Sequence, residues 1–118
     1  MIGDSTMANK KPYDAPETGW GQVFHELFTD AVLIQNHALN GRSTKSFRIE
    51  GHWAKVHELL QKGDYVFIQF GHNDQKISDT TKFADPQIAY RANLQRYIDE
   101  VKAKGAIPIL LTPMVRRK

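Results

Sequence analysis

The apolar run YVFIQF at residues 65–70 restricts the fold of this chain more than any other segment. Gln69 is its only polar residue, so side chains that alternate between the two faces of a strand would meet apolar surroundings on both. This pattern is typical of a strand in a parallel sheet that carries helices on each face. The sequence therefore predicts an α/β fold.

Helix and strand patterns alternate on the amino-terminal side of this run. In the stretch GWGQVFHELFTD, apolar residues from Trp20 to Phe28 recur at helical spacing and predict one apolar helix face. Ala31–Asn36 is a short apolar run that fits a buried strand. A second short helix is predicted from Trp53 to a glycine cap near Gly63.

The same alternation continues on the carboxyl-terminal side. Asp85–Pro86, as N-cap and first helical residue, predicts the start of a long helix, and Gly105 predicts its end. The run AIPILLTP predicts a last strand, in which Pro108 is tolerated near the beginning or on a sheet edge. With a first strand at Met1–Ile2, the pattern predicts about four parallel strands in a single domain, residues 1–118.

Composition excludes several classes of protein. A chain of 118 residues suffices for one hydrophobic core, and its net charge of +3 comes from scattered Lys and Arg residues, which does not favour nucleic-acid binding. The absence of cysteine excludes disulfides, thiolate catalysis and cysteine-ligated zinc. No apolar run approaches the ~20 residues of a membrane span. We also expect no signal peptide in this chain, since no basic and then apolar leader precedes the first strand.

Three residues that suit ester chemistry follow successive predicted strands: Ser5, Gly41 and Asn73. The carboxyl ends of parallel strands share one edge of a sheet, where ligands bind. Each residue also has a purely structural explanation, as a loop serine, a glycine with positive φ and an amide that caps a turn. Together they fit a serine nucleophile on a tight turn that Gly3 permits, with N–H donors aimed at a developing oxyanion.

The blocks GDST, NGRS and GHND carry a resemblance to the SGNH, or GDSL-type, hydrolases. The segments GWGQ, GRSTKSF and GDYVFIQFGHND, and a strand that ends in TP and is followed by RR, resemble the rhamnogalacturonan acetylesterase branch. The resemblance implies a flavodoxin-like three-layer α/β/α fold, no metal or other cofactor, and ester hydrolysis through an acyl-serine intermediate. It further implies that Ser5 is the nucleophile, and that the backbone N–H groups of Ser5 and Gly41 and the side chain of Asn73 form the oxyanion hole.

The remaining block of this family, an Asp-x-x-His that supplies the general base, does not occur in the sequence. His37, after a predicted strand, and His72, within the GHND block, are the alternatives for a base inside the chain. Because this block is missing and only two residues precede Gly3, we expect Met1 to correspond to an internal methionine of a longer enzyme. We also expect the chain alone to be inactive.

The resemblance implies an acetylated acidic polysaccharide substrate, such as rhamnogalacturonan in pectin. Arg42 and Arg116 are candidate contacts for uronic acid carboxylates, and Lys45, Arg48 and Arg117 lie on or next to the same loops; solvated surface charge is the alternative for each. A polymeric substrate favours a secreted or periplasmic full-length protein. Two other functions stay open. One is a non-catalytic carbohydrate-binding or interaction module of the same fold, and the other is a phosphate binder, which the absence of glycine-rich phosphate motifs disfavours.

Overall fold

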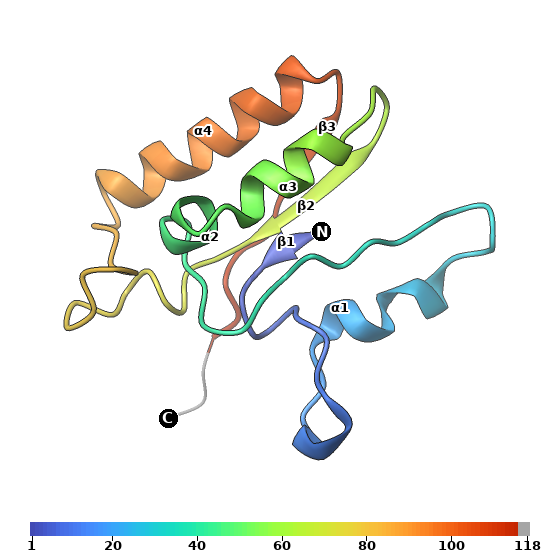
Figure 1. Ribbon diagram of the computed structural model, residues 1–118, viewed down its shortest axis with the longest axis horizontal. Helices are drawn as coiled ribbons and strands as arrows, with labels where there is room; N and C mark the ends of the chain where they lie inside the picture. Colours follow the sequence, from blue (N-terminus) through green and yellow to red (C-terminus); the bar gives the residue numbers. More distant parts are fainter. Residues whose placement is uncertain (116–118) are drawn as a thin grey trace.

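A parallel sheet forms the centre of the computed structural model, which describes residues 1–115. Its strands are β1 (Ile2–Gly3), β2 (Tyr65–Gln69) and β3 (Ile107–Leu110), in the spatial order β1-β2-β3 (Figure 1). Both pairings are parallel, with Gly3 opposite Gln69 and Tyr65 opposite Ile107. The apolar run YVFIQF therefore contains the middle strand, as its composition predicts.

The prediction of a strand at Ala31–Asn36 is wrong, and the described residues form three strands rather than the predicted four. An irregular segment at residues 35–39 instead runs beside β1 (Figure 1). The amide N–H groups of His37 and Leu39 donate to the carbonyls of Met1 and Gly3, over 2.9 and 3.0 Å.

Short helices precede the middle strand, and one long helix follows it. The long helix is α4 (Ala89–Ala103), in the region that the sequence predicts. The shorter elements are three α-helices and two 3-10 turns. In chain order they are the 3-10 turn η1 (Pro12–Asp14), α1 (Trp20–Val23), the 3-10 turn η2 (Phe24–Leu27), α2 (Ser46–Ile49) and α3 (His52–Leu59). None of the helices within residues 1–115 is long and apolar enough to cross a membrane.

Two predicted helix ends differ from the structure. α3 ends at Leu59 and is capped by Leu60, so Gly63 lies beyond the helix and is not its cap. Asp85 does not cap α4 directly: its Oδ1 accepts from the amides of Gln87 and Ile88, which form a turn just before the helix. The predicted end of α4 at Gly105 is confirmed within two residues.

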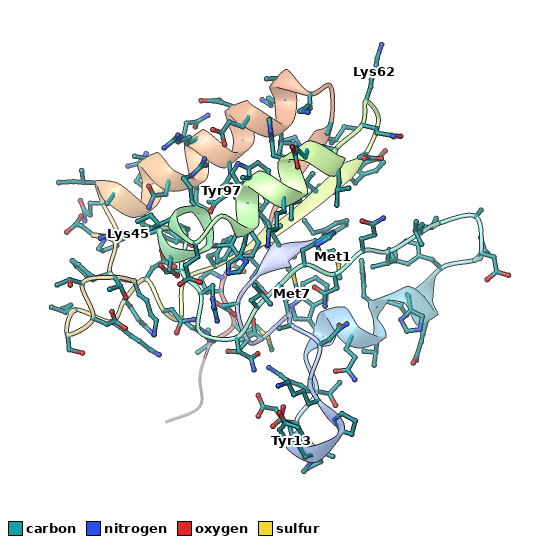
Figure 2. All side chains as sticks on the ribbon, in the orientation of Figure 1. Met1, Met7, Tyr13, Lys45, Lys62 and Tyr97 are labelled. Carbon is teal, nitrogen blue, oxygen red and sulfur yellow. The ribbon has the colours of Figure 1, made fainter. Side chains whose placement is uncertain are left out.

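Helices cover both faces of the sheet, which gives the three-layer arrangement. Side chains alternate along β2, so that Val66 and Ile68 face α2, α3 and α4, whereas Phe67 faces α1. Figure 2 shows Tyr97 within the first of these layers and Met1 and Met7 on the side of α1. The larger core comprises Ile2, Phe47, Trp53, Val56, Val66, Ile68, Phe70, Tyr97, Val101 and Ala106. The smaller core comprises Met1, Met7, Ala8 and Ala38, with Trp20, Phe24, Ile34, Phe67 and Leu111 packed against it.

We predict that Ile68→Ala destabilises the protein by about 2–5 kcal/mol, because Ile68 is fully buried in the middle strand and its truncation leaves a cavity. The change is measured as the free energy of unfolding in urea. Ile77→Ala is the matched control: this side chain is 77% exposed, and the same truncation is expected to cost less than about 0.5 kcal/mol. Equal effects of the two substitutions would contradict the assignment of the core.

Candidate active site

Ser5 lies in a tight turn directly after β1. The carbonyl of Asp4 accepts from the amides of Met7 and Ala8, which closes the turn over residues 4–8. The buried carboxylate of Asp4 also accepts from the amide and the hydroxyl of Thr6, over 3.0 and 2.9 Å. Asp4 therefore stabilises the backbone on both sides of Ser5, whose own side chain stays partly exposed.

Gly3 does not serve the turn in the way that the sequence analysis predicts. It belongs to β1 and does not have a positive φ. Its missing side chain instead permits close packing, since a Cβ atom there would lie 2.5 Å from the carbonyl oxygen of Gln69. A larger residue at this position would push β1 away from β2 and displace the turn that carries Ser5.

Gly41 lies in the loop that follows the segment beside β1. Its φ of +75° is one that other residues rarely adopt, and its surroundings are open, so backbone conformation is the reason for a glycine here. The carbonyl of Asn40 accepts from Nη1 of Arg42 over 2.9 Å. Because the peptide group is planar, this bond also orients the N–H of Gly41.

Asn73 is the third predicted residue, and a hydrogen bond joins it to the Gly41 loop. It is buried in the turn after β2, and its Nδ2 donates to the carbonyl of Arg42 over 2.9 Å. The Gly41 loop is in turn close to Ser5, because Leu39 pairs with Gly3 just before each loop begins. The structure thus brings all three loops to one end of the sheet, as their order after parallel strands predicts.

Asp74 also joins the turn after β2 to the segment that follows Gly41. Its Oδ1 accepts from the amide of Thr44 over 3.0 Å and from the Thr44 hydroxyl, which also accepts from Nδ2 of Asn93. The hydroxyl of Tyr97 donates to the Thr44 carbonyl over 2.8 Å. Burial raises the pKa of Asp74 above its ordinary value, although the bonds from Thr44 act in the opposite direction. Within residues 1–115 its Oδ2 has no hydrogen-bond partner.

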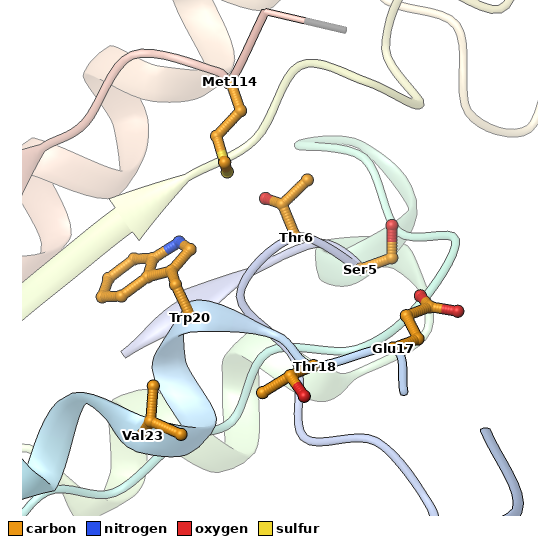
Figure 3. Close-up of a pocket in the computed structure, with 7 residues that line it drawn as sticks. All are labelled: Ser5, Thr6, Glu17, Thr18, Trp20, Val23 and Met114. Carbon is orange, nitrogen blue, oxygen red and sulfur yellow. The ribbon is translucent and has the colours of Figure 1, made fainter. Parts of the chain in front are cut away.

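An open hollow of about 450 Å³ lies beside Ser5, lined by Ser5, Thr6, Glu17, Thr18, Trp20, Val23 and Met114 (Figure 3). Gln69 lies behind it as the buried polar residue of the middle strand. Its Oε1 accepts from Nε1 of Trp20 and from the hydroxyl of Thr6, over 2.7 and 3.1 Å, and its Nε2 donates to the carbonyl of Thr112. Gln69 thereby fixes both the indole ring and the Thr6 side chain that line the hollow.

No histidine within residues 1–115 hydrogen-bonds to the hydroxyl of Ser5. His37 lies beside the beginning of β1, with its Nε2 near Oε1 of Gln35. His72 interacts through Nε2 with the carbonyl of Met114, over 2.5 Å. In the same part of the chain, no three His, Asp or Glu side chains gather closely enough to hold a metal ion.

The predicted basic residues have different surroundings. Arg42 lies at the site, but its guanidinium is paired with Glu50 through Nε and Nη2, each 2.9 Å from Oε2. Lys45 donates to the carbonyl of Thr80. Arg48 pairs with Glu100 and stacks on Tyr97 within the larger core layer. Arg116 and Arg117 lie outside the described residues.

Comparison with known proteins agrees with this geometry. The sequence pattern of the GDSL-like lipase/acylhydrolase family matches residues 1–118. The chain belongs to this family. Its fold also matches the crystal structure of YxiM from Bacillus subtilis, with a TM-score of 0.86 at 30% identity, over 98% of this chain and 32% of that one.

Proteins named as rhamnogalacturonan acetylesterases, one of them as a probable one, are also similar to this chain. Rhamnogalacturonan acetylesterase RhgT of Bacillus subtilis is 43% identical over the whole chain, and the probable rhamnogalacturonan acetylesterase YesY of that organism is 32% identical over 98% of it. A rhamnogalacturonan acetylesterase of Emericella nidulans is 43% identical over 63% of the chain and 27% of its own length. The chain spans 49% of RhgT and 53% of YesY, about half of each relative.

Sequence reasoning missed the buried groups that support the family motifs. Asp4 and Asp74 lie within the GDST and GHND blocks, but the sequence alone indicates no role for either. Their position at the end of a buried strand is the available signal, since a polar side chain that becomes buried there needs partners. Gln69, the single polar residue in an apolar strand, carries the same signal.

We predict that Asp74→Asn changes how stability depends on pH. The raised pKa means that the folded protein holds this proton to a higher pH than the unfolded chain. Ionisation of Asp74 then disfavours the folded state, so the stability of wild type relative to Asp74→Asn should fall as pH rises above about 4, and level off above the folded pKa. Urea unfolding of both proteins at a series of pH values measures this difference.

Asp79→Asn is the control with the opposite sign. Hydrogen bonds from Thr81 and Lys82 lower the pKa of Asp79 to about 2, so its contribution should be present above about pH 4 and be lost as pH falls toward 2. If the Asp74→Asn difference changed in this same sense, the bonds from Thr44 would outweigh burial, and the assigned cause of the Asp74 shift would be wrong.

Proposed function

We propose that this chain carries the nucleophile and the oxyanion hole of a carbohydrate acetylesterase. The observation that carries the proposal is the convergence of the Ser5, Gly41 and Asn73 loops at one end of the sheet, connected through Leu39–Gly3 and Asn73–Arg42 hydrogen bonds. Membership of the GDSL-like lipase/acylhydrolase family supports an esterase. The acetylesterase assignment rests on the similarity to RhgT and to the Emericella nidulans enzyme.

In the proposed reaction the Ser5 hydroxyl attacks the carbonyl carbon of an acetyl ester, and its proton passes to a general base. Negative charge then develops on the carbonyl oxygen. The N–H groups of Ser5 and Gly41 and the Nδ2 of Asn73 would stabilise it; only one hydrogen of Nδ2 is needed for Arg42. Collapse of this intermediate releases the sugar hydroxyl and leaves acetyl-Ser5, which water hydrolyses to acetate and free serine.

The proposed substrate is acetylated rhamnogalacturonan or a related acidic pectic polysaccharide. The hollow beside Ser5 has an apolar wall of Trp20, Val23 and Met114 that suits the acetyl methyl group and one face of a sugar ring. Arg42 would contact a uronic acid carboxylate by exchanging its bonds to Glu50. A polymer of this kind is found outside cells, so we further propose a secreted or periplasmic location.

Ser5→Ala in the full-length natural protein should lower kcat for an aryl acetate by more than about 10³, since no nucleophile remains. Asn73→Ala should lower kcat by about 10²–10³ through loss of one oxyanion donor. Ser78→Ala, at an exposed loop serine, is the control and should leave the rate unchanged. Undiminished hydrolysis of acetylated rhamnogalacturonan by Ser5→Ala would refute the proposed nucleophile.

The 118 residues alone should hydrolyse aryl acetates only slowly. They contain no Asp-x-x-His, and no histidine among residues 1–115 contacts the Ser5 hydroxyl, so only binding and the oxyanion hole would contribute. The test compares acetate release by this chain and by the full-length natural protein at equal concentration. Rapid turnover by the chain that Ser5→Ala abolishes would show that it contains a base.

The second candidate function is a non-catalytic carbohydrate-binding module of the same fold. It is compatible with residues 1–118, in which no Asp-x-x-His occurs. The two functions differ in one assay, because a binding module would retain acetylated rhamnogalacturonan on a column without releasing acetate, even as the full-length protein.

A further inference from the structure

Lys10 lies outside the GDST, NGRS and GHND blocks, yet its ammonium group contacts residues of two of the candidate site loops. Its Nζ donates to the carbonyl of Ser5 over 2.5 Å and to Oδ1 of Asn40 over 2.8 Å. It also pairs with Oε1 of Glu17 at 3.2 Å. These three acceptors match the three N–H donors of an ammonium group, so its hydrogen-bonding capacity is fully used.

The burial of this lysine is unusual. Its side chain is only 2% exposed, whereas lysine side chains are mostly solvated and are rarely buried without partners. The residue as a whole counts as half-buried because its backbone remains accessible. Removal of an ammonium from water is costly, so such a position is stable only where the acceptors are well placed.

The contact to Ser5 fixes the backbone on the carboxyl side of the proposed nucleophile. The peptide group between Ser5 and Thr6 is planar, and both of its polar atoms are held: the oxygen by Lys10 and the N–H by Oδ1 of Asp4, at 3.0 Å. Clamping this plane determines ψ of Ser5, and with it the direction in which the side chain leaves the turn.

The contact to Asn40 extends the same clamp to the second loop. Asn40 immediately precedes Gly41, and Arg42 already holds the Asn40 carbonyl. Lys10 is thus the one side chain among the described residues that hydrogen-bonds directly to both Ser5 and Asn40. These two contacts therefore restrict the distance between the Ser5 hydroxyl, which would attack, and the N–H of Gly41, which would donate to the oxyanion.

We propose that Lys10 is a positioning residue for acyl transfer, which holds the Ser5 turn and the Gly41 loop in their reactive arrangement. The inference rests on the proposed function for its catalytic meaning, but the contacts themselves can be tested without any activity. Lys11 provides a matched control, since it is the adjacent lysine and is exposed. Its Nζ lies 5.5 Å from the centre of the Tyr13 ring rather than at the site.

The structural test uses nuclear magnetic resonance of the 118-residue chain. A hydrogen bond to a carbonyl polarises the peptide group, so Lys10→Met should shift the Ser5 carbonyl ¹³C upfield and move the Thr6 amide ¹⁵N signal, whereas Lys11→Met should move neither. The chain has no cysteine, so aminoethylation of Lys10→Cys with bromoethylamine restores an ammonium of equal length at this position alone, and should restore both signals.

A folded Lys10→Met whose Ser5 and Thr6 signals match wild type would overturn the proposal. If Lys10→Met does not fold, the contact between Lys10 and Asn40 is tested in the wild-type chain. Nuclear Overhauser effects from the Lys10 Hε protons to the Asn40 Hβ protons would support the proposal, and their absence would overturn it.

The kinetic test uses the full-length natural protein and an aryl acetate. A misplaced nucleophile lowers the rate of the chemical step more than it weakens binding, so Lys10→Met should lower kcat by about 10- to 100-fold with KM changed less than about threefold. Lys11→Met should stay within about threefold of wild type. An equal kcat for Lys10→Met and Lys11→Met would overturn the role of Lys10. Activity that survives Ser5→Ala would instead refute the proposed function and leave the resonance test standing.

Discussion

The parallel pairing of Gly3 with Gln69 is the contact on which the arrangement at the site depends. β1 has only two residues, so little else determines where the following turn begins. The absent side chain of Gly3 lets the two backbones approach, and the amide of Asp4 then bonds to the Gln69 carbonyl at 3.3 Å. Because β1 and β2 run in the same direction and end together, the Ser5 turn and the Asn73 turn start at the same level.

Polar contacts hold the loops beyond that point, together with the apolar packing of Met7 and Ala8 in the Ser5 turn. Loops cannot share a regular backbone ladder, so their buried N–H and carbonyl groups need side-chain partners. Asp4 provides them for the Ser5 turn, Asp74 for the start of the GRSTKSF segment, and Gln69 for Thr6 and Trp20. Each of these residues joins segments that are far apart in sequence or steadies a turn that carries a candidate functional group. Loss of any one of them would leave N–H or hydroxyl donors without the acceptor that they have in this structure.

The sequence predicted the sheet well because the relevant signal is local. The composition of YVFIQF alone indicates a middle strand, and the order of strands and helices then indicates that Ser5, Gly41 and Asn73 share one edge. Local patterns failed where tertiary surroundings decide. The helical face predicted from Trp20 to Phe28 forms only as a short helix and a 3-10 turn, and Leu27 is 76% exposed. The buried hydrogen-bond network is not predictable from local patterns, because Thr44 and Asp74 lie 30 residues apart. The sequence likewise does not indicate that Lys10 differs in its surroundings from its neighbour Lys11.

The charges around the site constrain how an oxyanion would be stabilised. Asp4 and Asp74 are both buried nearby and interact, since the charge of Asp4 contributes to the raised pKa of Asp74. Two carboxylates behind the loops oppose a new negative charge, and Lys10, whose charge Glu17 balances, offsets them only in part. The two carboxylates therefore do not favour a nearby oxyanion. Short, directed N–H donors are the effective alternative, because a hydrogen bond acts at contact distance and depends on geometry more than on distant charge. The carboxylates themselves fit that solution, because each accepts from the backbone of a loop that we propose to present such donors.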